Sequence, residues 1–213
     1  WATGIDYSAL TDQLPWRSDP VIRTAIEAFP TLRILKQPFE ECLFSFLCSS
    51  TKQVPQIKAI HEMVALRLGN ELPDGSHALP TWSQIASGGE APLRDAKLGY
   101  RARYINQCAQ VIVERPGWLA SVEQMPTADA REELLRLPGV GRKIADCVLL
   151  FGAGRLDAFP IDTWVQKILG QAYSLKDWNL NQLQQFAQIH FGQQAGYAQQ
   201  FLFAAARAGK LRL

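Results

Sequence analysis

One lysine and one aspartate, each at the start of a predicted helix, are the residues in this sequence best placed to do chemistry. Lys143 follows the turn "LPGVG", and Asp162 stands 19 residues later in "PIDTWV". A neutral amine can act as a nucleophile, and a carboxylate can stabilise a positive charge that develops beside it. If the helix and turn between them let both side chains face one cleft, the pair predicts a nucleophile with a charge-stabilising partner. Taken singly, the lysine is more simply a solvated charge and the aspartate a helix cap.

The turn before Lys143 predicts a phosphate-binding site. Pro138 ends the preceding helix, because proline cannot donate to the helical hydrogen-bond ladder. Gly139 and Gly141 permit backbone angles and close approaches that a side chain would block. The next helix begins near Arg142, and unpaired amides at a helix N-terminus attract anions. A DNA phosphate could approach them without any reading of base sequence, although an ordinary glycine-rich turn explains these residues equally well.

Helices that could position these residues are predicted along almost the whole chain, from apolar spacing and from helix-starting and helix-ending residues. Ser18 is expected to cap the first, and a short helix is expected after Thr81 within a long loop over 70–92. No segment alternates convincingly as a strand would, so the predicted fold class is all-α. Besides the short helix after Thr81, the predicted helices span 18–29, 38–50, 54–69, 100–114, 118–124, 128–137, 142–151, 163–170, 180–191 and 195–208.

Composition sets broad limits on the class of protein. The 213 residues are 47% hydrophobic with a net charge of +2, which suits one or two small domains and permits a nucleic-acid partner without requiring one. Cys42, Cys48, Cys108 and Cys147 form no C-x-x-C pair, so they are expected to be reduced thiols of an intracellular protein. Neither an 18-residue apolar run nor a signal peptide is visible. The chain begins at Trp1 rather than Met, which is compatible with a missing upstream segment.

Four separated segments, in order, carry a resemblance to a known family: "PFEECLFSFLCSS", "LGYRARY", "LPGVGRKIADC" and "YAQQFLF". Together with "PID" they resemble the helix–hairpin–helix DNA glycosylase superfamily, and within it the 8-oxoguanine DNA glycosylase/AP lyases. The similarity runs from about Ser8 to Ala208. It implies two helical subdomains flanking a DNA-binding cleft, one over 38–125 and one over 1–37 plus 126–213 that carries the hairpin 134–152. It also implies a bifunctional base excision repair enzyme that removes 8-oxoguanine from duplex DNA.

The resemblance assigns roles to residues. It makes Lys143 the Schiff-base nucleophile and Asp162 the catalytic aspartate. The residues implied to hold the flipped base are Phe203, which stacks on it, Gln199, which reads its Watson–Crick edge, the Pro160 carbonyl, and Cys147, which shapes the pocket. From the sequence alone, core packing explains Phe203 and Cys147 at least as well.

Further residues are implied to contact DNA. These are Gly139, Val140, Gly141 and Arg142 in the hairpin, Thr51, Lys52 and Gln53 after "CSS", and Tyr100 with Arg101 or Arg103. The carbonyls of Leu135, Leu137 and Val140 match a site where K⁺ or Na⁺ bridges the hairpin to a phosphate. No cofactor is expected for the chemistry itself.

The sequence departs from the family pattern at three places. Thr51-Lys52-Gln53 stands where the family has an asparagine-rich turn, and Trp164 stands where it typically has a phosphate-holding histidine. The family's N-terminal β-rich domain has no counterpart between Trp1 and Leu213. We therefore expect a relaxed demand for cytosine opposite the lesion and a weaker rejection of guanine.

Three alternatives remain open at the level of sequence. An endonuclease III-like enzyme for oxidised pyrimidines uses the same lysine and aspartate, but it usually adds a four-cysteine iron–sulfur loop. No cysteine follows Cys147, so no such cluster is expected. An alkylated-base glycosylase lacks the lysine, and a non-catalytic hairpin module would bind DNA and cut nothing. The expected partner is damaged double-stranded DNA, with no membrane, for a monomeric, DNA-associated protein of the cytoplasm, nucleoid or nucleus.

Overall fold

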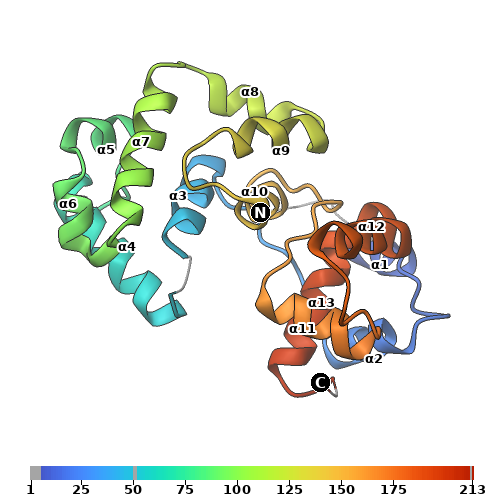
Figure 1. Ribbon diagram of the computed structural model, residues 1–213. Helices are drawn as coiled ribbons and strands as arrows, with labels where there is room; N and C mark the ends of the chain where they lie inside the picture. The colour runs from blue at the N-terminus through green and yellow to red at the C-terminus, as the bar shows by residue number, and fades with distance from the viewer. Residues whose placement is uncertain (1–5, 50–51, 212) are drawn as a thin grey trace. The chain divides into compact units, whose positions relative to one another are not determined.

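A computed structural model of the chain describes residues 6–49, 52–211 and 213. Over these residues every regular element is a helix, apart from one isolated bridge between Glu71 and His77, which confirms the predicted all-α fold (Figure 1). In chain order the elements are α1 (Tyr7–Asp12), α2 (Pro20–Ala28), α3 (Phe39–Ser49), α4 (Val54–Leu68), α5 (Trp82–Gly88), α6 (Ala91–Leu93), η1 (Arg94–Leu98), α7 (Arg101–Val113), α8 (Trp118–Gln124), α9 (Thr127–Leu135), α10 (Arg142–Phe151), α11 (Thr163–Ala172), α12 (Leu180–Phe191), η2 (Gly192–Gln194) and α13 (Ala195–Arg207).

Contacts between residues divide the chain into two units. The hairpin unit is Gln37–Val148, and the terminal unit is Trp1–Lys36 together with Leu149–Leu213. The second boundary lies later than the predicted division after residue 125, so residues 126–148 fall in the hairpin unit. The reason is packing, because α8 contacts both α9 and α3 and thereby holds the hairpin helices in that unit. Helix α10 runs across the boundary.

Helix α3 is the central buried helix of the hairpin unit. Its sequence is apolar almost all round, and it packs against α4, α7 and α8. The buried thiols of Cys42 and Cys108 belong to this core, where burial raises the pKa of each to about 12. They therefore stay protonated near neutral pH, as small buried groups that can act as weak donors. All four cysteines are buried, and none forms a disulfide, as the sequence suggested.

Helix α13 is the centre of the terminal unit, where it packs against α2, α11 and α12 (Figure 1). Its first turn approaches the chain after α10 so closely that only glycine fits. A Cβ on Gly196 would lie 2.2 Å from the Ala158 carbonyl oxygen, and the Gly196 amide donates to the Leu156 carbonyl at 2.7 Å. Tyr197 and Phe201 then fill the interior of this unit.

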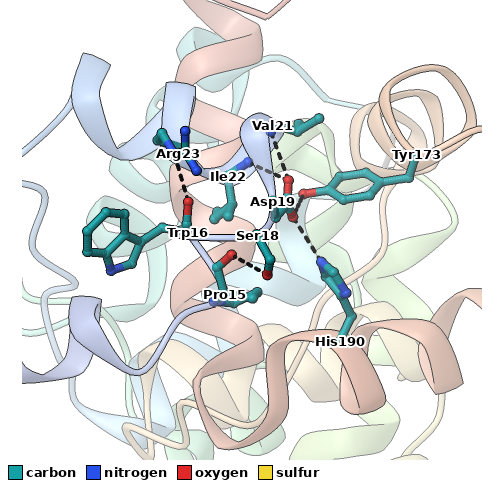
Figure 2. A network of polar contacts seen from close by, with 9 residues as sticks. All are labelled: Pro15, Trp16, Ser18, Asp19, Val21, Ile22, Arg23, Tyr173 and His190. Carbon is teal, nitrogen blue, oxygen red and sulfur yellow. Dashed lines mark hydrogen bonds and ion pairs between the residues drawn. The ribbon is translucent and has the colours of Figure 1, made fainter.

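A buried carboxylate joins three helices of the terminal unit, as Figure 2 shows. Oδ1 of Asp19 accepts the amides of Val21 and Ile22 at 2.8 and 3.1 Å. Its Oδ2 accepts the Tyr173 hydroxyl at 2.8 Å and lies 2.9 Å from Nε2 of His190. Burial and the charge of Asp19 both raise the pKa of Tyr173, which stays a neutral donor.

Asp19, not Ser18, is therefore the cap of α2, and the sequence-based prediction of that cap was wrong. Pro20 occupies the first helical position, which makes the residue immediately before it the cap. The Ser18 hydroxyl instead donates to the Pro15 carbonyl at 3.2 Å.

Candidate active site and DNA-contacting residues

The predicted turn between α9 and α10 is present, and its two glycines have different surroundings. Gly139 has φ of +77°, which favours glycine, and a Cβ there would lie 2.9 Å from Cβ of Tyr104. A Cβ on Gly141 would instead point into open space. The Val140 amide closes the turn by donating to the Leu137 carbonyl at 3.1 Å. Only the first glycine is thus required by packing, while the second leaves the start of α10 accessible.

A buried ion pair fastens the two hairpin helices together. Nε of Arg131 on α9 lies 2.6 Å from Oδ1 of Asp146, whose side chain is fully buried on α10. Arg142 approaches the other carboxylate oxygen at 3.8 Å. On the turn itself, the Cys108 thiol donates to the Pro138 carbonyl at 3.0 Å. The anchor was not predicted from the sequence, although an aspartate inside the apolar run "IADCVLL" indicates a charge that needs a partner.

Lys143 lies on the first turn of α10 and is half-buried. Its Nζ is 5.3 Å from the ring centroid of Phe46 on α3. No described carboxylate of the hairpin unit lies within ion-pair distance of the amine. The lysine is therefore directed against an aromatic face rather than held by a salt bridge, which leaves its nitrogen available for a ligand.

Asp162 caps α11, so the simpler role suggested by the sequence is realised. Its Oδ1 accepts the Val165 amide at 2.8 Å, and its own carbonyl accepts the Gln166 amide at 2.9 Å. The side chain is half-buried. No described residue of the terminal unit donates to Oδ2, so one carboxylate oxygen remains available to a ligand while the other is fixed by the helix.

The residues predicted to hold a base occupy different environments. On α13, Phe203 is only half-buried, whereas the adjacent Leu202 fills the core, so core packing does not account for the whole of this ring. Gln199 is buried and its Oε1 accepts from the side-chain amide of Gln200 at 2.6 Å. Pro160 is also buried in the terminal unit.

Cys147 lies on α10 within the hairpin unit, where it is buried beside Cys42. Its surroundings suit a small packing residue, the simpler interpretation given above. That the thiol shapes a base pocket stays a prediction.

Of the two arginines predicted to contact DNA on α7, the structure exposes Arg103 and buries Arg101. Tyr100 is 60% exposed, while Arg101 is 5% exposed and donates to the Tyr100 hydroxyl at 3.0 Å. The Arg101 guanidinium also lies 4.5 Å from the centroid of that ring. The buried Arg101 therefore holds the ring of the exposed Tyr100 in place through both contacts.

Tyr104, one helical turn after Tyr100, was not predicted as a site residue. Its ring is partly exposed, meets Tyr100 edge-on at 6.2 Å, and packs on Gly139 of the hairpin. The spacing of four residues between two aromatic side chains was the available signal. A cavity of about 100 Å³ opens beside this pair, lined by Leu47, Tyr100, Arg101, Tyr104, Ile105 and Gly139.

The turn after "CSS" is described only in part, because Thr51 lies outside the described residues. Lys52 is half-buried and its amide donates to the Ser49 carbonyl at 3.2 Å. Gln53 precedes α4, and its amide donates to Oε1 of Gln56 at 2.9 Å. The one described residue of this turn with an exposed side chain, Gln53, thus also starts a helix.

The carbonyls proposed for a monovalent cation suit such an ion in type, since K⁺ and Na⁺ prefer oxygen ligands. Pro138, three residues after Leu135, has no amide to donate to that carbonyl. The Leu137 carbonyl already accepts the Val140 amide. Elsewhere among the described residues, no group of three or more His, Cys, Asp or Glu side chains could hold a metal. Over the same residues, no helix is long and apolar enough to cross a membrane.

Comparison with known proteins decides the family. Residues 45–189 match the family described as "HhH-GPD superfamily base excision DNA repair protein". This chain belongs to that superfamily. The resemblance drawn from the four sequence segments is therefore confirmed.

Within the HhH-GPD superfamily, the chain is similar to proteins named for 8-oxoguanine. A structure of MBOgg1 with a low-affinity DNA ligand is 32% identical, with 98% of this chain and 72% of that chain covered and a TM-score of 0.90. The Clostridium acetobutylicum 8-oxoguanine glycosylase/lyase, solved with double-stranded DNA containing cytosine opposite 8-oxoG, is 30% identical, with 97% and 72% covered and a TM-score of 0.89.

Curated relatives are longer than this chain. The N-glycosylase/DNA lyase OGG1 of Arabidopsis thaliana is 33% identical over an alignment of 190 positions, which covers 81% of this chain and 51% of that protein. A probable N-glycosylase/DNA lyase of Methanothermobacter thermautotrophicus is 38% identical over 119 residues, or 56% of this chain and 38% of that protein. The chain thus spans about half or less of the length of these relatives.

Proposed function

We propose that this chain is a bifunctional DNA glycosylase and AP lyase that excises 8-oxoguanine from duplex DNA. The observation that carries the proposal is Lys143 on the first turn of α10, directly after the glycine turn. The similarity to 8-oxoguanine glycosylase/lyases at 30% identity or more supports the choice of lesion. The partner is damaged double-stranded DNA, and the protein acts as a DNA-associated intracellular monomer.

The chemistry proposed for Lys143 replaces one bond to the sugar by another. The damaged nucleotide first leaves the base stack, at a cost of about a few kcal/mol. The neutral amine then attacks C1′, and the N-glycosidic bond breaks so that its electron pair departs with the base, which takes up a proton. The sugar ring then opens: the C1′–O4′ bond breaks, O4′ takes up a proton, and C1′ and the lysine nitrogen form an imine. The imine allows a proton to leave C2′, and β-elimination expels the 3′ phosphate. No metal is needed for these steps.

Asp162 stabilises the positive charge that develops on the sugar as the base departs. Its helix-capping bond holds the carboxylate in one orientation, so no reorganisation is required during the reaction. Phe203, Gln199 and the Pro160 carbonyl hold the base by its face and edge.

The DNA backbone is bound by several groups that read no sequence. The accessible amides at the start of α10 take one phosphate, and a K⁺ or Na⁺ ion held by the hairpin carbonyls would neutralise part of its charge. Arg103 and Lys52 supply further positive charge, and the exposed Tyr100 ring supports the duplex where the nucleotide has left.

A panel of duplexes tests the substrate. Each contains 8-oxoguanine, guanine or thymine glycol, and 8-oxoguanine is placed opposite each of the four bases in turn. We expect 8-oxoguanine to be released fastest, with strand cleavage on its 3′ side and modest dependence on the opposite base. Faster release of thymine glycol would replace this proposal with an endonuclease III-like function, and DNA binding without release of any base would indicate a non-catalytic module.

A further inference from the structure

Two cations and two aromatic rings form a surface cluster in the terminal unit. Trp164 and Lys167 come from α11, and Phe203 and Arg207 come from α13, which packs against α11. The Arg207 guanidinium carbon lies 5.6 Å from the Trp164 ring centroid and 5.8 Å from that of Phe203. Nζ of Lys167 lies 5.8 Å from the Trp164 ring. We call these four residues the arginine–aromatic cluster.

The cations of the arginine–aromatic cluster have no protein acceptor among the described residues. Neither Lys167 nor Arg207 forms a hydrogen bond or ion pair there, and both side chains are exposed. Trp164 remains 39% exposed although indole rings are usually well buried. The cluster therefore offers positive charge and ring surface to solvent at the same place.

Aromatic contacts prepare a guanidinium to bind an anion. A planar guanidinium against two rings loses freedom before any ligand arrives, and its N–H groups keep the fork that matches two phosphate oxygens. Positive charge beside exposed rings is the combination that nucleic-acid strands favour, because phosphates and bases can both be contacted. A second cation, Lys167, strengthens the attraction from its own place beside the Trp164 ring.

We infer that Arg207 binds a backbone phosphate of the DNA and, through its contact with Phe203, fixes the orientation of the ring that stacks on the extruded base. This inference rests on the proposed function and adds a binding and positioning residue to it. Trp164 acts as the support that keeps the guanidinium over Phe203.

A purely structural role for Arg207 would look different. Arginine in the last turn of a helix interacts favourably with the helix dipole, by about 0.3–1 kcal/mol at an exposed position. Such a role would change the free energy of unfolding of every variant that loses the charge, but it would leave the salt dependence of DNA binding unchanged.

The test compares Arg207→Gln and Arg207→Lys with Lys210→Gln, which removes an exposed charge three residues later on the same segment. Dissociation constants for a duplex with a tetrahydrofuran abasic analogue are measured across a salt series. For Arg207→Gln we expect the slope of log K against log salt to weaken by about 0.9, the change for one lost phosphate contact. Arg207→Lys should keep the slope but slow single-turnover excision of 8-oxoguanine at least threefold, because the planar contact with Phe203 is lost.

The outcomes separate this inference from the proposed function. A wild-type slope in Arg207→Gln, or an equal change in Lys210→Gln, would overturn the phosphate contact, and wild-type excision by Arg207→Lys would overturn the positioning role. If the wild-type protein binds the duplex but releases no 8-oxoguanine, the proposed function fails while the salt series still decides the phosphate contact. Absence of DNA binding by the wild-type protein would overturn both.

Discussion

The two helices that carry the proposed chemistry begin in opposite ways. Helix α10 follows Gly141, which has no side chain to cap it, and its first residues are exposed or half-buried. Helix α11 follows Asp162, whose carboxylate accepts a hydrogen bond from the Val165 amide at 2.8 Å. The positive end of a helix is thus left open to an external anion in one case and used to orient the protein's own anion in the other.

The same contrast extends to what holds each helix start in place. In the hairpin unit a buried ion pair between Arg131 and Asp146 fixes α10 from within. In the terminal unit the start of α11 carries the exposed Trp164 with Arg207 against it. Helix α10, the helix proposed to accept a phosphate, is thus held by the ion pair of a buried carboxylate, so its uncapped N-terminus need not be stabilised by a cap.

The largest expected effect comes from removing the ion pair between Arg131 and Asp146, which anchors α10. Asp146→Ala should lower the free energy of unfolding by about 3–5 kcal/mol, because Arg131, whose side chain is only 15% exposed, loses the carboxylate that pairs with it. Urea denaturation measures the change. Arg142→Ala is the matched control, since its exposed side chain lies 3.8 Å from the same carboxylate and should cost less than about 1 kcal/mol. Equal costs for the two variants would show that the buried pair is not the anchor.

The capped start of α11 is tested next. Asp162→Asn should slow base release by about 10²–10³-fold, because the amide can still cap the helix but carries no charge. Single-turnover excision of 8-oxoguanine is the measurement, with Asp12→Asn as an exposed control. A decrease of less than about tenfold, or about 1.4 kcal/mol, would reduce Asp162 to a helix cap.

The N-terminus of α2 provides a comparison with that of α11. It is also capped by an aspartate, but no chemistry is proposed for it. Tyr173→Phe removes one hydrogen bond to the buried carboxylate of Asp19 and should cost about 1.5–3 kcal/mol of folding free energy. Excision by the folded variant should equal that of the wild type. Loss of excision without loss of stability would mean that the network in Figure 2 serves catalysis instead.

The smallest effects on stability are expected at the two glycines of the hairpin, which should respond differently to substitution. Gly139→Ala should cost about 1–2 kcal/mol, because φ is +77° and the new Cβ would press on Tyr104. Gly141→Ala has open space and should leave thermal stability unchanged, while weakening binding to damaged and undamaged duplex equally. Unchanged affinity of Gly141→Ala for both duplexes would place the phosphate elsewhere.

Residues that start or end helices made much of the fold predictable from the sequence. Helix α10 begins at Arg142 as predicted, because a glycine precedes it, and α12 spans Leu180–Phe191 as predicted, because Asn179 caps it. The short helix after Thr81 was predictable for the same reason. Such signals lie within a few residues of the element that they control.

The features that could not be predicted depend on partners distant in the chain. Asp146 meets an arginine 15 residues away, and Asp19 meets a histidine 171 residues away. Packing of α8 on α3 moved the boundary between the units, and no local pattern reports such a contact. In the candidate site, the sequence predicted that Arg101 or Arg103 contacts DNA. Only the packing of α7 shows that Arg103 is the exposed one.

The most direct test of the account asks whether Lys143 is the nucleophile. Wild type, Lys143→Gln and the exposed-lysine control Lys176→Gln are each incubated with 8-oxoguanine duplex and borohydride, which reduces an imine to a stable adduct. We expect the wild type and Lys176→Gln to be trapped covalently on the DNA, and Lys143→Gln to bind the duplex without forming the adduct. A covalent adduct formed by Lys143→Gln as readily as by the wild type would contradict the assignment of Lys143 and the mechanism built on it.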